Sequence, residues 1–322
     1  MSPNPVQHAY DLVAQHRTAA AVAVLETAGA QGDSPALAEL ATWHLRADPL
    51  PRDLPRARAL LRRAVQIGHV DAALTEIALT ANGSGAAADW PAALRLLEQA
   101  AMADPVAAEQ LAMVRSMTLD AEGRPAALPS PERLSSTPDV IRLPRLFTSQ
   151  ECFATATAAA DLLAPATIVD PVTGATKQDP IRTSDGASID PTRENLVIRA
   201  LNARIAAASG TTIEQGEPLS VLRYGPGQQY REHLDTITGA ANQRVVTVLV
   251  YLNDGFVGGE TIFPHVGLRI APRAGDAIVF RNTRADGRPD PAARHAGVPV
   301  TRGTKWLATR WIRAEAIDPW RF

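Results

Sequence analysis

Residues 224–235, Tyr-Gly-Pro-Gly-Gln-Gln-Tyr-Arg-Glu-His-Leu-Asp, are the most informative stretch of this chain, because they end in a His-x-Asp pair. On a β-strand, alternate side chains point to the same face, so His233 and Asp235 can reach one metal ion together. A third imidazole, His295, follows much later and can arrive on a distant strand. Two imidazoles and one carboxylate hold non-haem Fe(II) while leaving coordination positions open. The sequence therefore predicts a metal site of His233, Asp235 and His295.

Two other histidines compete with this assignment. His69 and Asp71 form a second His-x-Asp pair, but apolar residues around them have helical spacing, and positions i and i+2 of a helix do not share a face. His265 follows Pro264 in an expected turn, where a histidine is usually just solvated. His265 is the alternative third ligand if His295 does not bind the metal.

Further short sequences follow the His-x-Asp pair. They are residues 243–253 (Gln-Arg-Val-Val-Thr-Val-Leu-Val-Tyr-Leu-Asn), 258–264 (Gly-Gly-Glu-Thr-Ile-Phe-Pro), 272–277 (Pro-Arg-Ala-Gly-Asp-Ala), 295–300 (His-Ala-Gly-Val-Pro-Val), Lys305-Trp306 and Trp311. From about Val140 to Trp311 the chain closely resembles the prolyl 4-hydroxylase branch of the Fe(II)/2-oxoglutarate dioxygenases. The resemblance implies a jelly-roll barrel that binds Fe(II), with 2-oxoglutarate and O2 as co-substrates and ascorbate as an optional reductant.

The resemblance also assigns side chains to the co-substrate. In that family the positions that match Lys305, Thr261 and Tyr224 contact 2-oxoglutarate. The residue types suit this role, because an ammonium supplies a point charge for a carboxylate and the two hydroxyls supply hydrogen bonds. Taken alone, Lys305 on a strand would be a solvent-facing lysine, since lysine is rarely buried unpaired.

Substrate contacts are implied for three further residues. In the same family the position matching Arg244 lies near the peptide, and the positions matching Tyr230 and Trp311 line the pocket. Simpler interpretations remain open, because Arg244 could merely solvate the end of the apolar run 245–252 and Trp311 could be a core residue. No catalytic residue beyond the metal ligands is expected.

The first part of the chain, residues 1–125, is rich in alanine and leucine at helical spacing. Residues 53–64 align with residues 89–100, a repeat of roughly 36 residues, and two helices per such period mark an α-solenoid. The pattern resembles Sel1-like repeats, relatives of the tetratricopeptide repeat. Such arrays commonly bind peptides or proteins, and a helical cap that only stabilises the barrel or a dimer is an equally good explanation.

The expected architecture is α+β and multidomain. An N-terminal α-solenoid over residues 1–125 precedes a Pro/Ser-rich linker over 126–139 and a double-stranded β-helix (jelly-roll) barrel with supporting helices over 140–322. The polar stretch 167–193 is expected to be a long loop that could fold over the substrate. Helices are expected over 148–163 and 195–208, and strands over 140–143, 220–224, 245–252, 268–271, 277–281, 296–300 and 305–312.

Composition limits the environment and the partners. The formal net charge of -2 gives no general attraction to nucleic acid or to an anionic membrane, and no apolar run reaches the length of a membrane span. The single cysteine, Cys152, allows no internal disulfide, and the first residues lack a basic and apolar leader. We therefore expect a cytoplasmic protein that binds neither nucleic acid nor membrane, of unknown oligomeric state.

The expected reaction is hydroxylation of an amino-acid side chain in a peptide or protein, with release of succinate and CO2. Proline is the first guess by resemblance alone, and the helical repeats are expected to recruit the substrate. Two alternatives stay open. One is a hydroxylase of a free amino acid or small metabolite, and the other is a non-catalytic binding module.

Overall fold

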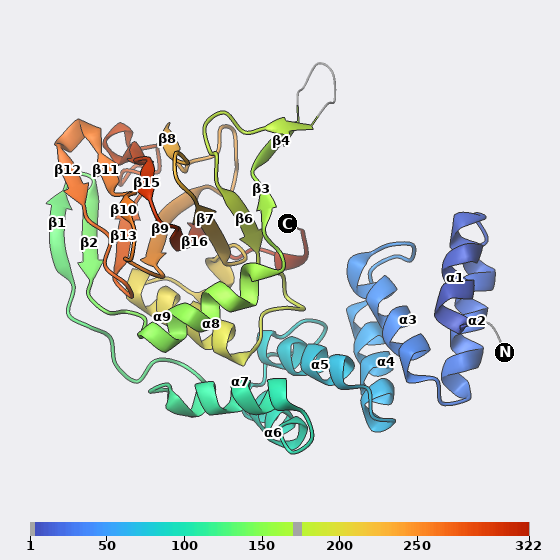
Figure 1. Cartoon of the computed structure of the whole chain (residues 1–322). Coiled ribbons are helices and arrows are strands. Elements are labelled where there is room, and N and C mark those ends of the chain that lie inside the picture. Colours follow the sequence, from blue (N-terminus) through green and yellow to red (C-terminus); the bar gives the residue numbers. More distant parts are fainter. Residues whose placement is uncertain (1–3, 170–175, 322) are drawn as a thin grey trace. The chain divides into compact units, whose positions relative to one another are not determined.

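The computed structural model describes residues 4–169 and 176–321, and its backbone contacts divide the chain into two compact units (Figure 1). The helical unit comprises Met1–Met117 and Pro191–Arg199, and the barrel unit comprises Thr118–Asp190 and Ala200–Phe322. The division falls ahead of residues 126–139, which the sequence suggested as a linker. Part of that stretch is a strand, described below.

Helices α1 to α7 form the first part of the chain. They are α1 (Pro5–Ala14), α2 (Thr18–Ala30), α3 (Ser34–Arg46), α4 (Leu54–Gln66), α5 (Val70–Asn82), α6 (Trp90–Ala100) and α7 (Pro105–Ser116). The predicted repeat of helix pairs is confirmed, because α4 and α6 begin in the same way. Asp53 caps α4 by accepting the Arg56 N–H at 2.9 Å, and Asp89 caps α6 by accepting the Ala92 N–H at 2.8 Å.

The interior of the helical unit is apolar with one buried ion pair. Fully buried leucines come from successive helices: Leu25, Leu37, Leu40, Leu60, Leu79 and Leu97. Among them, the Arg58 guanidinium lies 2.7 Å from the Glu76 carboxylate, and both side chains are buried. Because a buried charge must be paired to be tolerated, this contact fixes α4 against α5.

The barrel unit is built from two main antiparallel sheets. The eight-stranded sheet has the order β1 (Glu132–Ser136), β2 (Asp139–Leu143), β13 (Ala277–Arg281), β9 (Arg244–Tyr251), β16 (Lys305–Arg313), β7 (Ser220–Tyr224), β6 (Asp185–Ser188) and β3 (Ala164–Pro165). The four-stranded sheet has the order β12 (Leu268–Ile270), β11 (Thr261–Phe263), β14 (His295–Gly297) and β8 (Tyr230–His233). Two-stranded ribbons pair β10 (Val257–Gly258) with β15 (Val300–Arg302), and β4 (Thr167–Val169) with β5 (Thr176–Gln178).

The barrel core lies where the two main sheets face each other. Phe263 of the four-stranded sheet meets Phe280 of the eight-stranded sheet edge to face, with ring centroids 5.1 Å apart. Two antiparallel sheets that pack face to face in this way form a jelly roll, so the expected fold is confirmed. Strand β9 lies inside the larger sheet and six of its eight residues are buried, which explains its nearly continuous apolar sequence.

Two helices accompany the sheets, as expected. Helix α8 (Ser149–Ala160) begins with a capping box, in which Thr148 and Glu151 each accept the other's backbone N–H. Helix α9 (Leu196–Ser209) follows the polar stretch. None of the helices within the described ranges is long and apolar enough to cross a membrane.

Three expected elements differ in the structure. Strand β1 lies inside the expected linker and pairs with β2, so the chain is already part of the sheet there. The strand expected over 296–300 is two strands, β14 and β15. The pairing is interrupted because Pro299 has no N–H and because the Val298 N–H donates to the Glu260 carbonyl at 3.0 Å. The expected loop over 167–193 contains β4, β5 and β6, and its residues 170–175 lie outside the described part.

Candidate active site and metal centre

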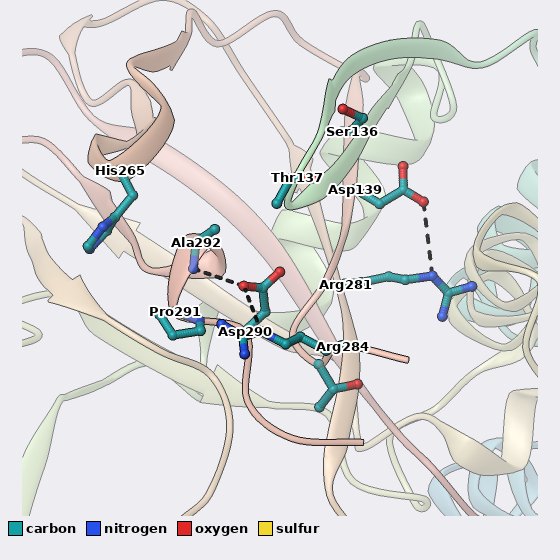
Figure 2. Close-up of a pocket in the computed structure, with 10 residues that line it drawn as sticks. Ser136, Thr137, Asp139, His265, Arg281, Arg284, Asp290, Pro291 and Ala292 are labelled. Atoms are coloured by element: carbon teal, nitrogen blue, oxygen red, sulfur yellow. Dashed lines mark hydrogen bonds and ion pairs between the residues drawn. The ribbon is translucent and has the colours of Figure 1, made fainter. Parts of the chain in front are cut away.

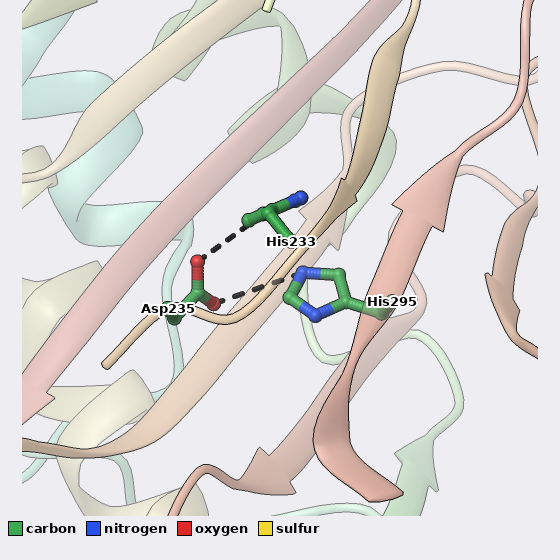
Figure 3. Close-up of side chains that lie close together, drawn as sticks. All are labelled: His233, Asp235 and His295. Atoms are coloured by element: carbon green, nitrogen blue, oxygen red, sulfur yellow. Dashed lines mark ion pairs between the residues drawn. The ribbon is translucent and has the colours of Figure 1, made fainter. Parts of the chain in front are cut away.

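Three side chains converge on one point between the sheets. His233 ends β8, Asp235 lies two residues beyond it, and His295 begins β14 (Figure 3). One ligand atom from each residue lies within 4.8 Å of the others, and among the described residues no other group of three such side chains meets this condition. His233 Nε2 is 3.4 Å from Asp235 Oδ1, and His295 Nε2 is 3.7 Å from Asp235 Oδ2. The structure thus brings together the three residues that the sequence suggested as ligands.

Hydrogen bonds to the backbone orient both imidazoles. His233 Nδ1 lies 2.8 Å from the Arg231 carbonyl, and His295 Nδ1 lies 3.1 Å from the Ala293 carbonyl. Because a carbonyl only accepts, each ring must carry its proton on Nδ1, which leaves Nε2 as a lone-pair donor. His233 Nε2 is buried without a hydrogen-bond partner in the described chain. Such a buried nitrogen is suited to bind a divalent metal ion.

Burial and charge set the protonation states of His295 and Asp235. Burial lowers the pKa of His295 to about 4, and the nearby Asp235 offsets only part of this effect, so the imidazole is neutral at pH 7. Burial alone would raise the pKa of Asp235. The nearby imidazoles of His295 and His233 and the hydrogen bond from Thr247 outweigh it, so this pKa lies well below its usual range and the carboxyl is ionised.

A buried ammonium lies in the same cavity as the three ligands, which Tyr224 and Thr261 also line. Lys305 is only 3% exposed, and its Nζ donates to the Gly259 carbonyl at 2.7 Å. Burial lowers its pKa to about 8, and the charge of Glu260 offsets only part of the shift. No carboxylate of the described residues lies within ion-pair distance of this ammonium. A desolvated cation that faces a cavity is stabilised by an anionic ligand.

Two tyrosine rings lie near the lysine. Its Nζ lies 5.3 Å from the ring centroid of Tyr224 and 5.5 Å from that of Tyr251. Tyr224 is the direct register partner of Lys305 on β7 and β16, and Thr261 Oγ1 accepts the Tyr251 hydroxyl at 2.7 Å. Since a hydroxyl can donate as well as accept, Thr261 still has its own proton to offer a ligand.

Tyr251 was not singled out from the sequence, although a signal existed. It lies in the apolar run of β9, where a tyrosine with a buried hydroxyl needs a partner. Thr247 lies four residues earlier on the same strand, so both side chains face the site. Polar residues at even spacing within an apolar strand mark its functional face.

Residues with implied substrate roles occupy two places. The Tyr230 ring stacks on His233 at a centroid distance of 3.5 Å, and burial raises the pKa of this tyrosine to about 12. Trp311, 8% exposed, lies under the Arg244 guanidinium at 4.2 Å. Tyr230 therefore covers the His233 ring, Trp311 lines the same cavity, and Arg244 lies over the Trp311 ring.

Arg244 belongs to a buried ion cluster. Its Nε and Nη2 donate to the two carboxylate oxygens of Glu217 at 2.7 and 2.6 Å, and Arg313 Nε donates to the same carboxylate. Glu217 has a side chain only 4% exposed. The bidentate pair fixes the guanidinium over Trp311, so Arg244 does more than solvate the end of a strand. Glu217 was not expected from the sequence, because its partners lie on other strands.

The competing histidines do not join the ligand group. His69 caps α5 by accepting the Ala72 N–H at 3.2 Å, a role of a helix N-terminus. His265 is half exposed and lies 3.8 Å from Glu232. It borders a separate open hollow of about 640 Å³, which Figure 2 shows between the turn at Thr137 and the residues Asp290 to Ala292.

Known proteins agree with this site. The profile of the 2OG-Fe(II) oxygenase superfamily matches residues 219–313, which contain all the residues discussed as ligands and co-substrate contacts. Prolyl 4-hydroxylase 1 of Arabidopsis thaliana is 35% identical over 207 residues, which cover 58% of this chain and 73% of the relative. The chain belongs to the prolyl 4-hydroxylase family of 2OG-Fe(II) oxygenases.

Two solved structures are also similar. One is the 2OG complex of the viral collagen prolyl hydroxylase vCPH from Paramecium Bursaria Chlorella virus-1, 28% identical, with a TM-score of 0.45 over 55% of this chain and 96% of that one. The other is a Sel1 repeat protein from Oxalobacter formigenes, 19% identical, with a TM-score of 0.30 over 34% of this chain and 85% of that one.

As a member of the prolyl 4-hydroxylase family, the protein is an oxygenase that depends on Fe(II) and 2-oxoglutarate. The donor set fits Fe(II), because two imidazoles and one carboxylate occupy only three of about six coordination positions. The cavity fits 2-oxoglutarate, since Lys305 supplies a buried cation for its far carboxylate. The expectation of a non-catalytic binding module is therefore wrong.

Proposed function

We propose that this protein hydroxylates a prolyl side chain within a peptide or protein, using Fe(II), 2-oxoglutarate and O2 and releasing succinate and CO2. The observation that carries the proposal is the buried ammonium of Lys305, which has no carboxylate partner among the described residues and lies in the same cavity as His233, Asp235 and His295. A metal site alone would suit many reactions. The anchor for an acidic co-substrate restricts the reaction to oxygenases that consume a 2-oxo acid.

Each side chain has a role that its geometry supports. His233, Asp235 and His295 hold the metal, and Lys305 binds the far carboxylate of 2-oxoglutarate as a charge-assisted donor. The Thr261 hydroxyl, held by Tyr251, adds a hydrogen bond to that carboxylate. Fe(II), when bound, supplies the activation of O2 that is coupled to decarboxylation of 2-oxoglutarate.

The proposed substrate lies beside Tyr230 and Trp311. Glu217 engages Nε and Nη2 of Arg244 in the described chain, which leaves Nη1 for a carbonyl oxygen of the substrate. Trp311 offers an apolar surface beside that donor. A proline ring presents apolar carbons next to a backbone carbonyl, so the combination suits a prolyl residue within a chain.

A peptide is favoured over a free amino acid by the surroundings of the site. The hollow in Figure 2 lies along the segment that precedes His295, since Pro291 and Ala292 line it. The Cα atoms of Ala292 and His295 are at most about 11 Å apart, so a few extended residues can span from the metal to this hollow. The relatives also carry the name prolyl 4-hydroxylase.

The helical repeats are proposed to recruit the protein substrate. The support is that every residue assigned to the chemistry lies in the barrel unit, so the helix pairs are available for another task. Stacked helix pairs commonly bind peptides or proteins along one face. No particular partner follows from the chemistry of these helices.

One experiment tests the function. The purified protein, with Fe(II), 2-oxoglutarate and O2, with and without ascorbate, is incubated with a proline-rich peptide, a proline-free peptide of equal charge, or free L-proline. Mass spectrometry should find one added oxygen atom in the proline-rich peptide, with a matching amount of succinate. Oxidation of free proline alone would favour the small-molecule alternative. Absence of succinate under all conditions would reject the proposal.

A further inference from the structure

A chain of two buried hydrogen bonds leads to the carboxylate of Asp235. Thr247 Oγ1 donates to Asp235 Oδ2 at 2.6 Å, and Asn282 Nδ2 donates to Thr247 Oγ1 at 2.9 Å. Thr247 is 0% exposed and Asn282 is 1% exposed. We infer that Thr247 and Asn282 are positioning residues that orient Asp235 so that it offers the metal a single oxygen. The inference rests on the proposed metal site and deepens it.

The direction of each hydrogen bond follows from the chemistry of the groups. A carboxylate oxygen accepts hydrogen bonds, so the Thr247 hydroxyl donates its one proton to Asp235 Oδ2. Thr247 Oγ1 must then act as an acceptor toward its other neighbour. The amide nitrogen of Asn282 is a donor, whereas its carbonyl oxygen would face a second lone pair. The orientation of the Asn282 amide is therefore fixed by the hydrogen bond that Thr247 donates to Asp235.

This chain of hydrogen bonds, a relay from Asn282 through Thr247 to Asp235, is needed because of where Asp235 lies. Strand β8 ends at His233, so Asp235 is outside the strand and no ladder of backbone hydrogen bonds holds its position. Thr247 belongs to β9, inside the eight-stranded sheet, and Asn282 follows β13 directly. The two histidines are carried by the four-stranded sheet. The relay thus ties the carboxylate to one sheet while both imidazoles belong to the other.

The relay determines how many coordination positions of the metal remain open. Thr247 occupies Oδ2, and Oδ1, 3.4 Å from His233 Nε2, is the oxygen left for the metal. A carboxylate free to rotate can use both oxygens and occupy a further coordination position. With one oxygen held by Thr247, three positions stay available for a bidentate co-substrate and O2. Partners of this kind commonly set metal affinity as well as geometry.

A purely structural explanation is that the relay only satisfies buried polar groups. The two explanations differ in what the variants change. If the relay were structural, removing it would lower the thermal stability of the barrel and leave the affinity of the folded protein for metal unaltered. If it positions Asp235, the affinity of the folded protein for metal falls and the uncoupled consumption of 2-oxoglutarate changes with it.

The experiment measures Co(II) affinity of the full chain anaerobically from the visible absorption of the bound ion, with Fe(II) as a competitor. Thr247→Val keeps the shape but removes the donor, and it should weaken binding by about ten- to a hundredfold. Thr247→Ser keeps the hydroxyl and should restore most of the affinity. Asn282→Asp offers Thr247 an acceptor, draws its proton away from Asp235 and should resemble Thr247→Val.

A matched control is Thr155→Val, which removes another fully buried threonine hydroxyl, one that bonds the Glu151 carbonyl of helix α8 at 2.7 Å. It should keep the affinity of the unaltered protein for metal. Unaltered Co(II) affinity in folded Thr247→Val or Asn282→Asp would overturn the inference. So would failure of the unaltered protein to bind Co(II), which would reject the metal site too. Normal Co(II) binding without any hydroxylated peptide would reject only the proposed substrate.

Discussion

His233 and His295 are direct cross-strand partners of β8 and β14, and their ring centroids are 4.3 Å apart. This register explains why two residues far apart in the chain can share a metal. A slip of the pairing by one residue would turn one imidazole to the opposite face of the sheet. The third ligand is therefore selected by strand pairing.

Replacing His295 by alanine should abolish metal-dependent turnover while leaving the barrel folded. The side chain makes one backbone hydrogen bond and otherwise points Nε2 at the metal position, so its loss removes a ligand. Isothermal titration with Fe(II) under anaerobic conditions and succinate release measure the effect. The matched control is His265→Ala, which changes an exposed histidine and should retain both properties. The reverse pattern would make His265 the ligand.

Lys305→Ala should weaken the affinity for 2-oxoglutarate. A charge-assisted hydrogen bond to a carboxylate contributes about 1.5–3 kcal/mol, which corresponds to roughly ten- to more than hundredfold in affinity. Fe(II) binding should hardly change, because Lys305 is not a ligand. The KM for 2-oxoglutarate in succinate release is the measurement, with Arg302→Ala, an exposed cation on β15, as the control. An unaltered KM would reject Lys305 as the anchor.

The KM for 2-oxoglutarate should rise with pH in the alkaline range. Burial lowers the pKa of Lys305 to about 8 in the free protein, and only the charged ammonium attracts the carboxylate. The interaction is therefore fully present below this pKa and is lost as pH rises through it, by about tenfold per pH unit beyond it. Steady-state kinetics between about pH 6.5 and 9.5 test whether the KM for 2-oxoglutarate rises with pH. A KM that falls with pH would contradict the assignment.

Glu217→Gln should destabilise the barrel unit. The carboxylate accepts from both Arg244 and Arg313, and its removal takes away the counter-charge that these two partly buried guanidiniums share. Breaking such a pair costs about 3 kcal/mol in free energy of unfolding. Urea denaturation measures it against Glu132→Gln, which removes an exposed ion pair with Arg142 and should cost below about 1 kcal/mol. Equal effects of the two variants would refute the buried cluster as a stabilising feature.

A chain that begins at Thr118 should still bind Fe(II) and 2-oxoglutarate, because every proposed ligand lies downstream. It should oxidise a short peptide normally and lose efficiency on a full protein substrate, through weaker capture. Starting later would remove β1, which pairs with β2. Insolubility of the shorter chain would indicate a structural role for the helices. Full efficiency on the protein substrate would show that the repeats serve another purpose.

The sequence alone allowed correct predictions wherever the deciding interactions are local. The helix repeat follows from periodic apolar residues and from aspartates such as Asp53 and Asp89 that cap helices within three residues. The capping box at Thr148 is local in the same way. The chemistry of His-x-Asp follows from the alternation of side chains along one strand.

Errors arose where the local signal was ambiguous. The stretch 126–139 looked like a linker because serine and proline are frequent there, yet residues of β1 gain partners across the turn from β2. The strand predicted over 296–300 was interrupted by Pro299, whose missing N–H ends the pairing of β14. Local composition could not show whether a neighbouring strand was available.

What the sequence by itself determined is the type of chemistry: two imidazoles, a carboxylate and a lysine in a β-rich half behind helical repeats. Only the tertiary structure decided which groups meet. Strand register paired His233 with His295, folding buried Lys305 in the same cavity, and packing placed Thr247 against Asp235. The physical reason is that these contacts join strands distant in the chain, so their geometry depends on sheet order and register rather than on neighbouring residues.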